Sequence, residues 1–255
     1  MKASIRRTEI LTLMDREGNV TVDYLVEKYQ VSEETIRRDL RLLDEDGYIK
    51  RVHGGAEKLK TTTRYLPSDQ RRSIQTNEKE AIGKACLSYL EEDDSVFIDG
   101  KTTCQVLADL IPDDLRLTIV TNSIIVARHL MDKKYLKVHI VGGELNQDDG
   151  LMTGHKLIQE LKGYRFDKAI FSCIGVDVTG CYFAKMDAQQ LAYTLKEISS
   201  KLILLADSSK INQYAFLFGL DLDSFSHIIT DEKAPDSFVE KVQQNSCHLV
   251  RASLA

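Results

Sequence analysis

The chain has 255 residues and a net charge of −5, and 29% of its residues are charged and 43% hydrophobic. This composition predicts a globular protein of one or two domains. No apolar run reaches the roughly 18 residues of a membrane span, and the charged start, Met1 to Glu9, lacks the apolar stretch of a signal peptide. The five cysteines form no C-x-x-C pair, so we expect free thiols, no metal, no cofactor and a cytoplasmic location.

The charge is divided unevenly along the sequence. Residues 1–75 hold 15 lysines and arginines against 13 acidic residues, and the remainder holds 19 against 26. The acidity therefore belongs to the second part of the chain. The negative total does not exclude a nucleic-acid partner for the first part, because local basic groups set the field there.

Two short helices are predicted at the start of the chain. The first has Ile10, Leu13 and Met14 at helical spacing and a stop at Gly18. The second begins after Thr21, which is a good N-cap residue. Its apolar stripe consists of Val22, Leu25, Val26 and Tyr29.

A third helix follows after a turn of only two residues and is capped by Ser32. Ile36, Leu40 and Leu43 form its apolar face, and we expect Gly47 to end it. The next segment, YIKRVHGG, is typical of a basic strand that runs into a glycine pair. The face of the helix opposite its apolar side holds Glu34, Arg37, Arg38 and Arg41.

These parts make a winged helix-turn-helix, whose recognition helix enters the major groove of DNA. The alternative is a small helical bundle with a solvated charged face, but that alternative does not explain three arginines opposite the core. We therefore expect residues 1–57 to bind double-stranded DNA. The candidate contacts are Ser32, Glu34, Thr35, Arg37, Arg38, Arg41, Lys50, Arg51 and His53.

The segment VSEETIRRDLRLLDEDGYIKRVHGGA resembles the signature of the DeoR family of bacterial transcriptional regulators. The resemblance implies a regulator, most often a repressor, with a sensor domain behind its DNA-binding domain. Residues 58–76 are polar and include three consecutive threonines and a proline, so we expect a linker there.

From residue 77 to residue 255, short apolar segments alternate with helices of about ten residues. This alternation predicts an α/β fold, a Rossmann-like and mainly parallel sheet with helices on both faces. The expected strands are SVFID, LTIVT, KVHIVGG, FDKAIFSCIGVD, KLILLAD, FSHIIT and CHLVR.

Polar residues and glycines follow four of these strands, at the sheet edge where ligands bind in α/β folds. Thr102, Thr103 and Ser123 stand at helix N-termini, where free N–H groups favour phosphate. Lys210 adds a positive charge. Each signal alone is an ordinary cap, but together they predict a site for a small phosphorylated molecule. The four segments are DGKTT from Asp99, TNS from Thr121, GG from Gly142 and DSSK from Asp207.

These segments resemble the sensor domain of the DeoR family, which implies a fold similar to ribose-5-phosphate isomerase and a sugar-phosphate effector. Two departures are Lys101, where the family has glycine, and the region after Gly180, which lacks the usual G-L-T-T. We expect Gly100 to take over the missing glycine's conformational role. The implied effector contacts are Asp99, Gly100, Lys101, Thr102, Thr103, Thr121, Asn122, Ser123, Gly142, Gly143 and Lys210.

Two shorter segments, D-x-x-x-T-C from Asp99 and I-F-S-C-x-G-V-D from Ile170, resemble the fucose-operon regulators of the family. This resemblance implies a deoxy-sugar phosphate as the effector. Winged-helix regulators usually bind paired half-sites, so we expect a homo-oligomer, a dimer or a tetramer, held together by the second domain.

Two other functions stay open for the second domain. An isomerase-like enzyme would need a general base, for which Asp99, Asp177 and Asp207 are the carboxylates near predicted strand ends. A dimerisation module would bind no ligand. We expect no catalytic residues.

Overall fold

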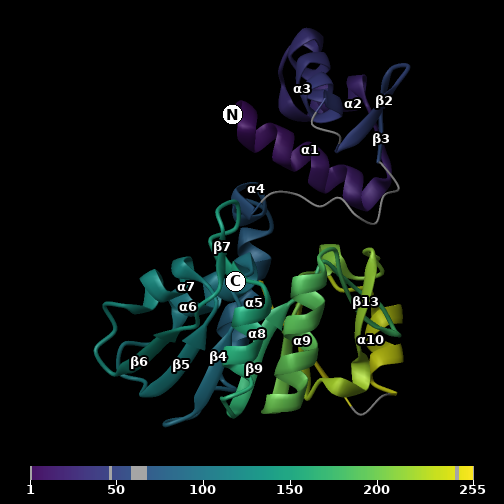
Figure 1. Ribbon diagram of the computed structural model, residues 1–255. Helices are drawn as coiled ribbons and strands as arrows, with labels where there is room; N and C mark the ends of the chain where they lie inside the picture. The colour runs from purple at the N-terminus through teal and green to yellow at the C-terminus, as the bar shows by residue number, and fades with distance from the viewer. Residues whose placement is uncertain (1, 46–47, 59–67, 245–246, 255) are drawn as a thin grey trace. The chain divides into compact units, whose positions relative to one another are not determined.

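A computed structural model of the protein describes every residue except 1, 46–47, 59–67, 245–246 and 255. The chain divides into two compact units, Met1–Ile74 and Gln75–Ala255 (Figure 1). The predicted helix stop at Gly47 and much of the predicted linker lie outside the described residues, and helix α4 (Ser68–Arg72) lies within the linker range. No helix in the described part of the chain is long and apolar enough to cross a membrane.

The first unit combines three helices with a small antiparallel sheet in the order β1-β3-β2. The winged helix-turn-helix expected from the sequence is confirmed, while the three-residue strand β1 was not foreseen. The elements are α1 (Ala3–Glu17), β1 (Asn19–Thr21), α2 (Val22–Tyr29), α3 (Glu33–Glu45), β2 (Ile49–Val52) and β3 (Gly55–Lys58).

Local signals end and begin these helices as predicted. Gly18 follows α1 with a φ of 78°, a conformation that glycine adopts without strain. The Thr21 hydroxyl accepts a hydrogen bond from the Tyr24 N–H at 3.3 Å, which caps α2. The Ser32 hydroxyl accepts from the Thr35 N–H at 3.3 Å and caps α3 in the same way.

The core of the first unit lies between α1, α3 and the sheet, with Ile10, Leu25 and Ile36 fully buried. Beside it, Arg6 Nε and Asp39 Oδ2 form a buried ion pair at 2.6 Å that joins α1 to α3. Burial of α3 on this side leaves its arginine face to solvent.

The second unit is built on a seven-stranded sheet in the order β15-β14-β12-β9-β4-β5-β6. All its strand pairs are parallel. The α/β class and all seven expected strands are confirmed. The strands are β4 (Ser95–Ile98), β5 (Leu117–Thr121), β6 (Leu136–Ile140), β9 (Phe166–Ser172), β12 (Ser199–Leu205), β14 (His227–Asp231) and β15 (His248–Ala252).

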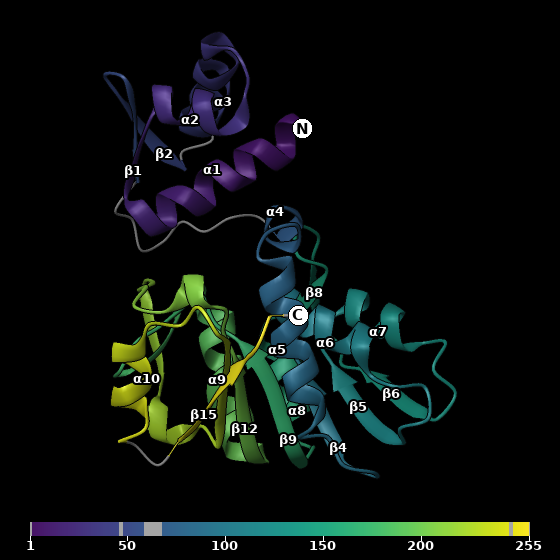
Figure 2. The same ribbon diagram turned by 180° about the vertical axis from the view of Figure 1, so that it is seen from behind.

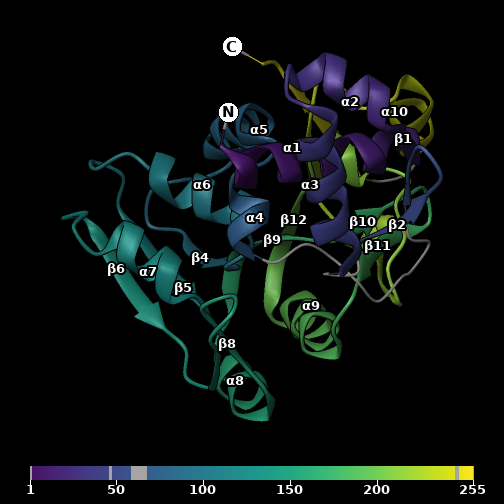
Figure 3. The same cartoon turned by 90° about the horizontal axis from the view of Figure 1, so that it is seen from above.

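Helices cover both faces of this sheet (Figures 2 and 3). Ile82, Leu107 and Val126 of α5, α6 and α7 pack on one face, and Leu157 and Leu195 of α8 and α9 pack on the other. The helices are α5 (Thr76–Leu87), α6 (Thr102–Leu110), α7 (Ile124–Leu130), α8 (His155–Leu161), α9 (Met186–Ile198) and α10 (Asp236–Val242).

Two small antiparallel sheets, β7-β8 and β10-β11-β13, were not predicted. Their strands have two to five residues, too short for a period to show in the sequence. They are β7 (Glu144–Asn146), β8 (Leu151–Thr153), β10 (Gly175–Val176), β11 (Gly180–Phe183) and β13 (Leu217–Asp221).

The strand order locates the ligand edge of the large sheet. The chain runs outward from β4 through β5 to β6, and then returns to β9 on the other side of β4. The order therefore reverses between β4 and β9, and ligands of open α/β sheets bind beyond the carboxyl ends of the strands at such a reversal.

The five cysteines are buried and unbridged, as expected.

Candidate functional site

A cavity opens at the carboxyl end of the large sheet, beside the reversal between β4 and β9. It encloses about 530 Å³ of empty space, its open mouth included. Three of the predicted effector contacts line it, namely Asp99, Lys101 and Asn122. Its other polar lining residues are Asn146, Asp149, Thr153, Lys185 and Asp187, and its apolar wall includes Leu151, Leu157, Phe171, Phe183, Leu191 and Leu195.

Hydrogen bonds hold the segment after β4 against the segment after β5. The Gly100 N–H donates to Asn122 Oδ1 at 3.2 Å and to Asp99 Oδ1 at 2.8 Å. The Gly100 carbonyl accepts from Gln105 Nε2 of α6 at 2.8 Å. The cavity floor is therefore made of two strand ends that the sequence places 22 residues apart.

Gly100 is needed for space and not for a positive φ. It is absent from the described residues with positive φ, which corrects the conformational role expected for it. A Cβ at this position would lie 2.2 Å from Leu151 Cδ2 and 2.4 Å from Ser123 Cβ. Lys101 has ordinary extended geometry, with φ −65° and ψ 151°, so its backbone is unstrained.

Lys185 is a lining residue that the sequence did not reveal. Its Nζ lies 3.4 Å from Oδ2 of Asp149, whose side chain is 8% exposed. Asp149 lies just before β8, so two of the unpredicted small sheets bring this pair together. The only signal in the sequence is that Lys185 follows the region where the chain departs from the G-L-T-T pattern.

Lys101 and Lys185 occupy the same position in two helices. Each is the N-cap residue, Lys101 of α6 and Lys185 of α9, and neither cap makes a side-chain hydrogen bond to its helix. A cation at a helix N-terminus opposes the helix dipole. An anion in the cavity between the two lysines would offset both unfavourable placements.

Lys210 is held beside the cavity and does not line it. Its Nζ donates to Ser172 Oγ at 2.8 Å and lies 3.4 Å from Asp207 Oδ2. Ser172 is the last residue of β9, so Lys210 does lie at the predicted edge of the sheet. The role of Lys210 as an effector contact stays a prediction.

The carboxylate of Asp207 is buried and ionised. Burial by itself raises its pKa, but the ammonium of Lys210, the hydroxyl of Ser209 and the buried Lys79 of α5 together hold the pKa below its usual value. The Asp207 carboxylate therefore interacts electrostatically with both Lys79 of α5 and Lys210.

The other predicted effector contacts lie outside the cavity lining, and several of them have structural partners. The buried Thr103 hydroxyl has no hydrogen-bond partner within the described residues. Ser123 Oγ accepts from the Val126 N–H at 3.3 Å and caps α7. The Gly142 N–H donates to Glu160 Oε2 at 2.9 Å, and a Cβ at Gly143 would lie 2.7 Å from the Thr153 carbonyl oxygen. The remaining three, which are buried, are Thr102, Thr103 and Thr121.

Asp177, a candidate base of the alternative enzyme, holds a turn. Its Oδ1 accepts from the Thr179 N–H at 2.8 Å and from the Thr179 hydroxyl at 2.6 Å, and Oδ2 accepts from the Tyr182 hydroxyl at 3.2 Å. Burial raises its pKa, but these bonds and one from the Gly180 N–H lower it overall. A carboxylate so stabilised in its ionised form is a weak base.

Metal chemistry has no support in the described part of the chain. No group of three or more histidine, cysteine, aspartate or glutamate side chains there could hold a metal ion.

The predicted DNA-contacting residues form an exposed surface on α3 and the wing. All nine are exposed except Thr35, which is partly buried. Arg37 forms an ion pair with Glu33 at 2.5 Å, and both side chains are about half exposed. Asp44 Oδ1 accepts from the Arg51 N–H at 3.2 Å, which ties the wing to the end of α3.

Known proteins resemble both units. Residues 6–62 match the family described as "DeoR-like helix-turn-helix domain", and residues 74–232 match "DeoR C terminal sensor domain". The chain is 31% identical to the glycerol-3-phosphate regulon repressor of Escherichia coli K12, covering 98% of this chain and 99% of that one. It is 32% identical to the L-fucose operon activator of the same organism, covering 91% and 96%.

A third relative is the HTH-type transcriptional repressor GlcR of Bacillus subtilis, 29% identical with 96% of this chain and 95% of that one covered. Among solved structures, ribose 5-phosphate isomerase A of Methanocaldococcus jannaschii matches with a TM-score of 0.37, 13% identity and coverage of 52% and 53%. The family matches and the full-length relatives together show that the chain belongs to the DeoR family of bacterial transcriptional regulators.

Proposed function

We propose that this DNA-binding transcriptional regulator represses a carbohydrate-utilisation operon and releases it when a phosphorylated sugar occupies the cavity. Residues 1–57 bind the operator, residues 58–76 link the domains and residues 77–255 sense the effector. The protein acts in the cytoplasm as a homo-oligomer, a dimer or a tetramer.

The observation that carries the proposal is the composition of the cavity. Lys101 and Lys185 supply two cations for a phosphate, while Asp99, Asp149 and Asn122 supply acceptors for sugar hydroxyls. The apolar wall suits the carbon face of a sugar.

The names of the relatives support a small phosphorylated or sugar effector. One relative is named for a glycerol-3-phosphate regulon and another for an L-fucose operon. Two of the three relatives compared above are named as repressors and one as an activator, which favours repression.

A thermal-shift screen with a panel of sugar phosphates tests the proposal and identifies the effector. A ligand at 100 times its dissociation constant adds about 2.7 kcal/mol to the free energy of unfolding. Lys185→Met and Lys101→Gly weaken the shift and its salt dependence, because each removes a cation from the site. Lys196→Met, at the exposed far end of α9, is the matched control and leaves the shift unchanged.

Lys210 is tested separately, because it lies beside the cavity. Lys210→Ala abolishes the effector response and keeps operator binding, since the two functions belong to different units. Loss of operator binding in this variant contradicts an effector role and indicates a role in folding.

Operator binding is tested with Arg37→Ala and Arg38→Ala in a gel-shift titration. A lost bidentate guanine contact costs about 1–3 kcal/mol and relaxes specificity at one base pair. Lys137→Ala on β6 is the control. Unchanged affinity in both arginine variants shows that α3 is not the recognition helix.

An isomerase-like enzyme with an added DNA-binding domain is the alternative function. The hydrogen-bonded, ionised Asp177 argues against it. A turnover assay with pentose and deoxy-sugar phosphates separates the two, because a pure regulator binds its effector without converting it.

A further inference from the structure

Aromatic side chains gather on the outer surface of the small sheet β10-β11-β13 and the adjoining helix α9. Phe216 and Tyr214 are each 60% exposed, and Phe218 and Tyr193 are each 41% exposed. Tyr182 of β11, which is partly buried, completes the group. We call these five residues the aromatic patch.

Contacts join four of the five residues. The Tyr182 ring lies edge-on to the rings of Tyr214 and Phe218, with centroids 5.2 and 5.6 Å apart. The Tyr193 hydroxyl donates to the Phe218 carbonyl at 3.4 Å. Phe216 lies between Tyr214 and Phe218 in the sequence.

The patch lies on β13, which is an edge strand of its small sheet, and helix α9 occupies one backbone carbonyl of that edge. The Phe218 carbonyl already accepts a hydrogen bond from Gln189 Nε2 of α9 at 2.6 Å. A partner would therefore pack against the rings, because this backbone group of β13 already has a bonding partner.

The patch differs in its charged neighbours from Tyr135, another exposed aromatic residue of the second unit. Residues 214–220, YAFLFGL, include no charged residue. By contrast, exposed Tyr135 lies beside Lys134, whose Nζ is 5.4 Å from the ring centroid, and the nearby edge strand β6 carries Lys137. Lysines beside exposed apolar residues or on edge strands, such as Lys134 and Lys137, hinder association with another chain. The segment 214–220 contains no lysine.

We propose that the aromatic patch is the surface through which two copies of this chain associate. The four most exposed rings together offer roughly 400 Å² per copy, since a fully exposed aromatic side chain offers about 200 Å². A standard interface takes about 800 Å² per partner. The patch thus supplies about half of such an interface and forms its apolar centre, which is where aromatic residues concentrate.

Charge argues for a second copy as the occupant. Residues 76–255 hold 19 basic and 26 acidic side chains, so two copies repel each other over much of their surface. Because the segment 214–220 has no charged residue, two copies can meet there with fewer like charges opposite each other. A recognition helix reads one half-site, and a two-fold dimer presents the second helix.

The test is sedimentation velocity of the full chain over a range of concentrations. Phe216→Asp places a carboxylate from each copy in an apolar centre, and we expect the dissociation constant of the assembly to rise at least about tenfold. Tyr135→Asp, which adds the same charge at a similarly exposed tyrosine outside the patch, leaves it unchanged. Circular dichroism confirms that both variants are folded, and Tyr214→Asp repeats the test at a second position.

A wild-type chain that sediments as a monomer up to about 100 µM overturns the proposal. So does a folded Phe216→Asp variant that keeps the wild-type assembly, or an equal effect of Tyr135→Asp. The inference deepens the proposed function and rests on its homo-oligomer. A monomeric wild type would contradict both, whereas an unchanged assembly of Phe216→Asp would contradict only the aromatic patch. Sedimentation requires neither DNA nor effector, so its failure is distinct from a failure of the effector screen.

Discussion

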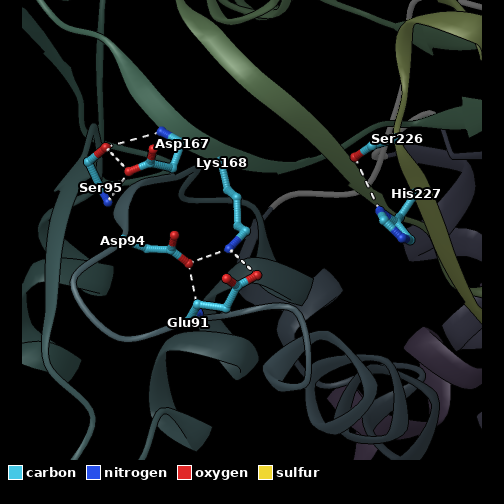
Figure 4. Close-up of polar contacts among 7 residues, drawn as sticks. All are labelled: Glu91, Asp94, Ser95, Asp167, Lys168, Ser226 and His227. Atoms are coloured by element: carbon cyan, nitrogen blue, oxygen red, sulfur yellow. Dashed lines mark hydrogen bonds and ion pairs between the residues drawn. The ribbon is translucent and has the colours of Figure 1, made fainter.

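The two ends of strands β4 and β9 both carry buried charges, and the cavity described above lies at the carboxyl end. At the amino end, Lys168 Nζ donates to Asp94 Oδ2 and to Glu91 Oε1 (Figure 4). There too, Asp167 Oδ2 accepts from the Ser95 N–H at 2.8 Å and from the Ser95 hydroxyl at 2.6 Å. At the carboxyl end, Asp99 and its neighbours surround about 530 Å³ of space.

This difference separates charges that hold the fold from charges that hold a ligand. At the amino end, each charge is matched by a neighbour, and the Lys168 side chain is 5% exposed. At the carboxyl end, Asp99, Lys101 and Lys185 line a cavity, although Lys185 also pairs with Asp149. Clustered charge alone therefore does not identify a ligand site, whereas its position at the carboxyl edge and the cavity do.

The largest expected effect on the free energy of unfolding comes from a substitution at the amino ends of β4 and β9. Lys168→Met leaves Asp94, 11% exposed, without its ammonium partner, and breaking such a pair costs about 3 kcal/mol in the free energy of unfolding. Urea unfolding measures the loss. Lys201→Met, at the exposed neighbouring position on β12, is the control, and equal losses in the two variants would contradict the role of the ion pair.

The same pair predicts a pH dependence. Burial lowers the pKa of Lys168, but hydrogen bonds to Asp94 and Glu91 outweigh burial and raise it overall. A raised folded-state pKa means that the stabilisation is complete below about pH 10 and is lost as the pH rises through the higher folded value. The difference in the free energy of unfolding between the wild type and Lys168→Met should therefore narrow in strongly alkaline solution.

Asp207→Asn tests the buried charges at the carboxyl end of the sheet, and we expect it to cause the next largest loss in the free energy of unfolding. The variant leaves Lys210 and Lys79 without their shared carboxylate, which costs about 2 kcal/mol. Because the pKa of Asp207 is lowered, its stabilisation is present above about pH 4 and is lost as the pH falls through the folded value. Urea unfolding at descending pH should show wild type and variant converging in acid, and a constant gap would contradict this assignment.

Gly100→Ala tests whether the cavity depends on close packing of its floor. The added methyl would overlap Leu151 and Ser123, and such overpacking costs about 1–2 kcal/mol. We expect a lower melting temperature together with loss of the effector's thermal shift. Gly163→Ala, where the nearest atom to a new Cβ is a carbonyl oxygen at 3.3 Å, is the control and keeps the shift.

The smallest expected effect belongs to Ser95→Ala at the amino end. The Ser95 hydroxyl is the first cause of the lowered pKa of Asp167. The carboxylate keeps the bond from the Ser95 N–H and is exposed to water, so the loss is about 0.5–1 kcal/mol. Unfolding midpoints give the stability change, and effector affinity stays at the wild-type value, since the site is at the other end of the sheet.

The helix caps and the strands were readable from the sequence because their signals are local. Thr21, Ser32 and Gly18 end or begin helices through bonds within a few residues. Apolar runs such as SVFID and KLILLAD show a buried strand without knowledge of its neighbours. The α/β class and the winged helix-turn-helix follow from these local patterns.

The candidate site was predictable only in part. Asp99, Lys101 and Asn122 follow strands and belong to the carboxyl edge of any parallel sheet. Lys185 and Asp149 are 36 residues apart. Asp149 lies between the short strands β7 and β8, and Lys185 follows the short strand β11. The periodicity of the sequence does not predict a contact between two such distant loop residues.

The sequence by itself determined the family signature, the seven strands of the large sheet and the edge of that sheet that can bind a ligand, because each depends on short stretches of chain. The tertiary structure decided which charged residues pair with each other and which of them line the cavity, and it brought Tyr182 against Tyr214 and Phe218 in the aromatic patch. Those outcomes depend on distances between segments far apart in the chain, and on space such as that beside Gly100, where a single methyl group does not fit.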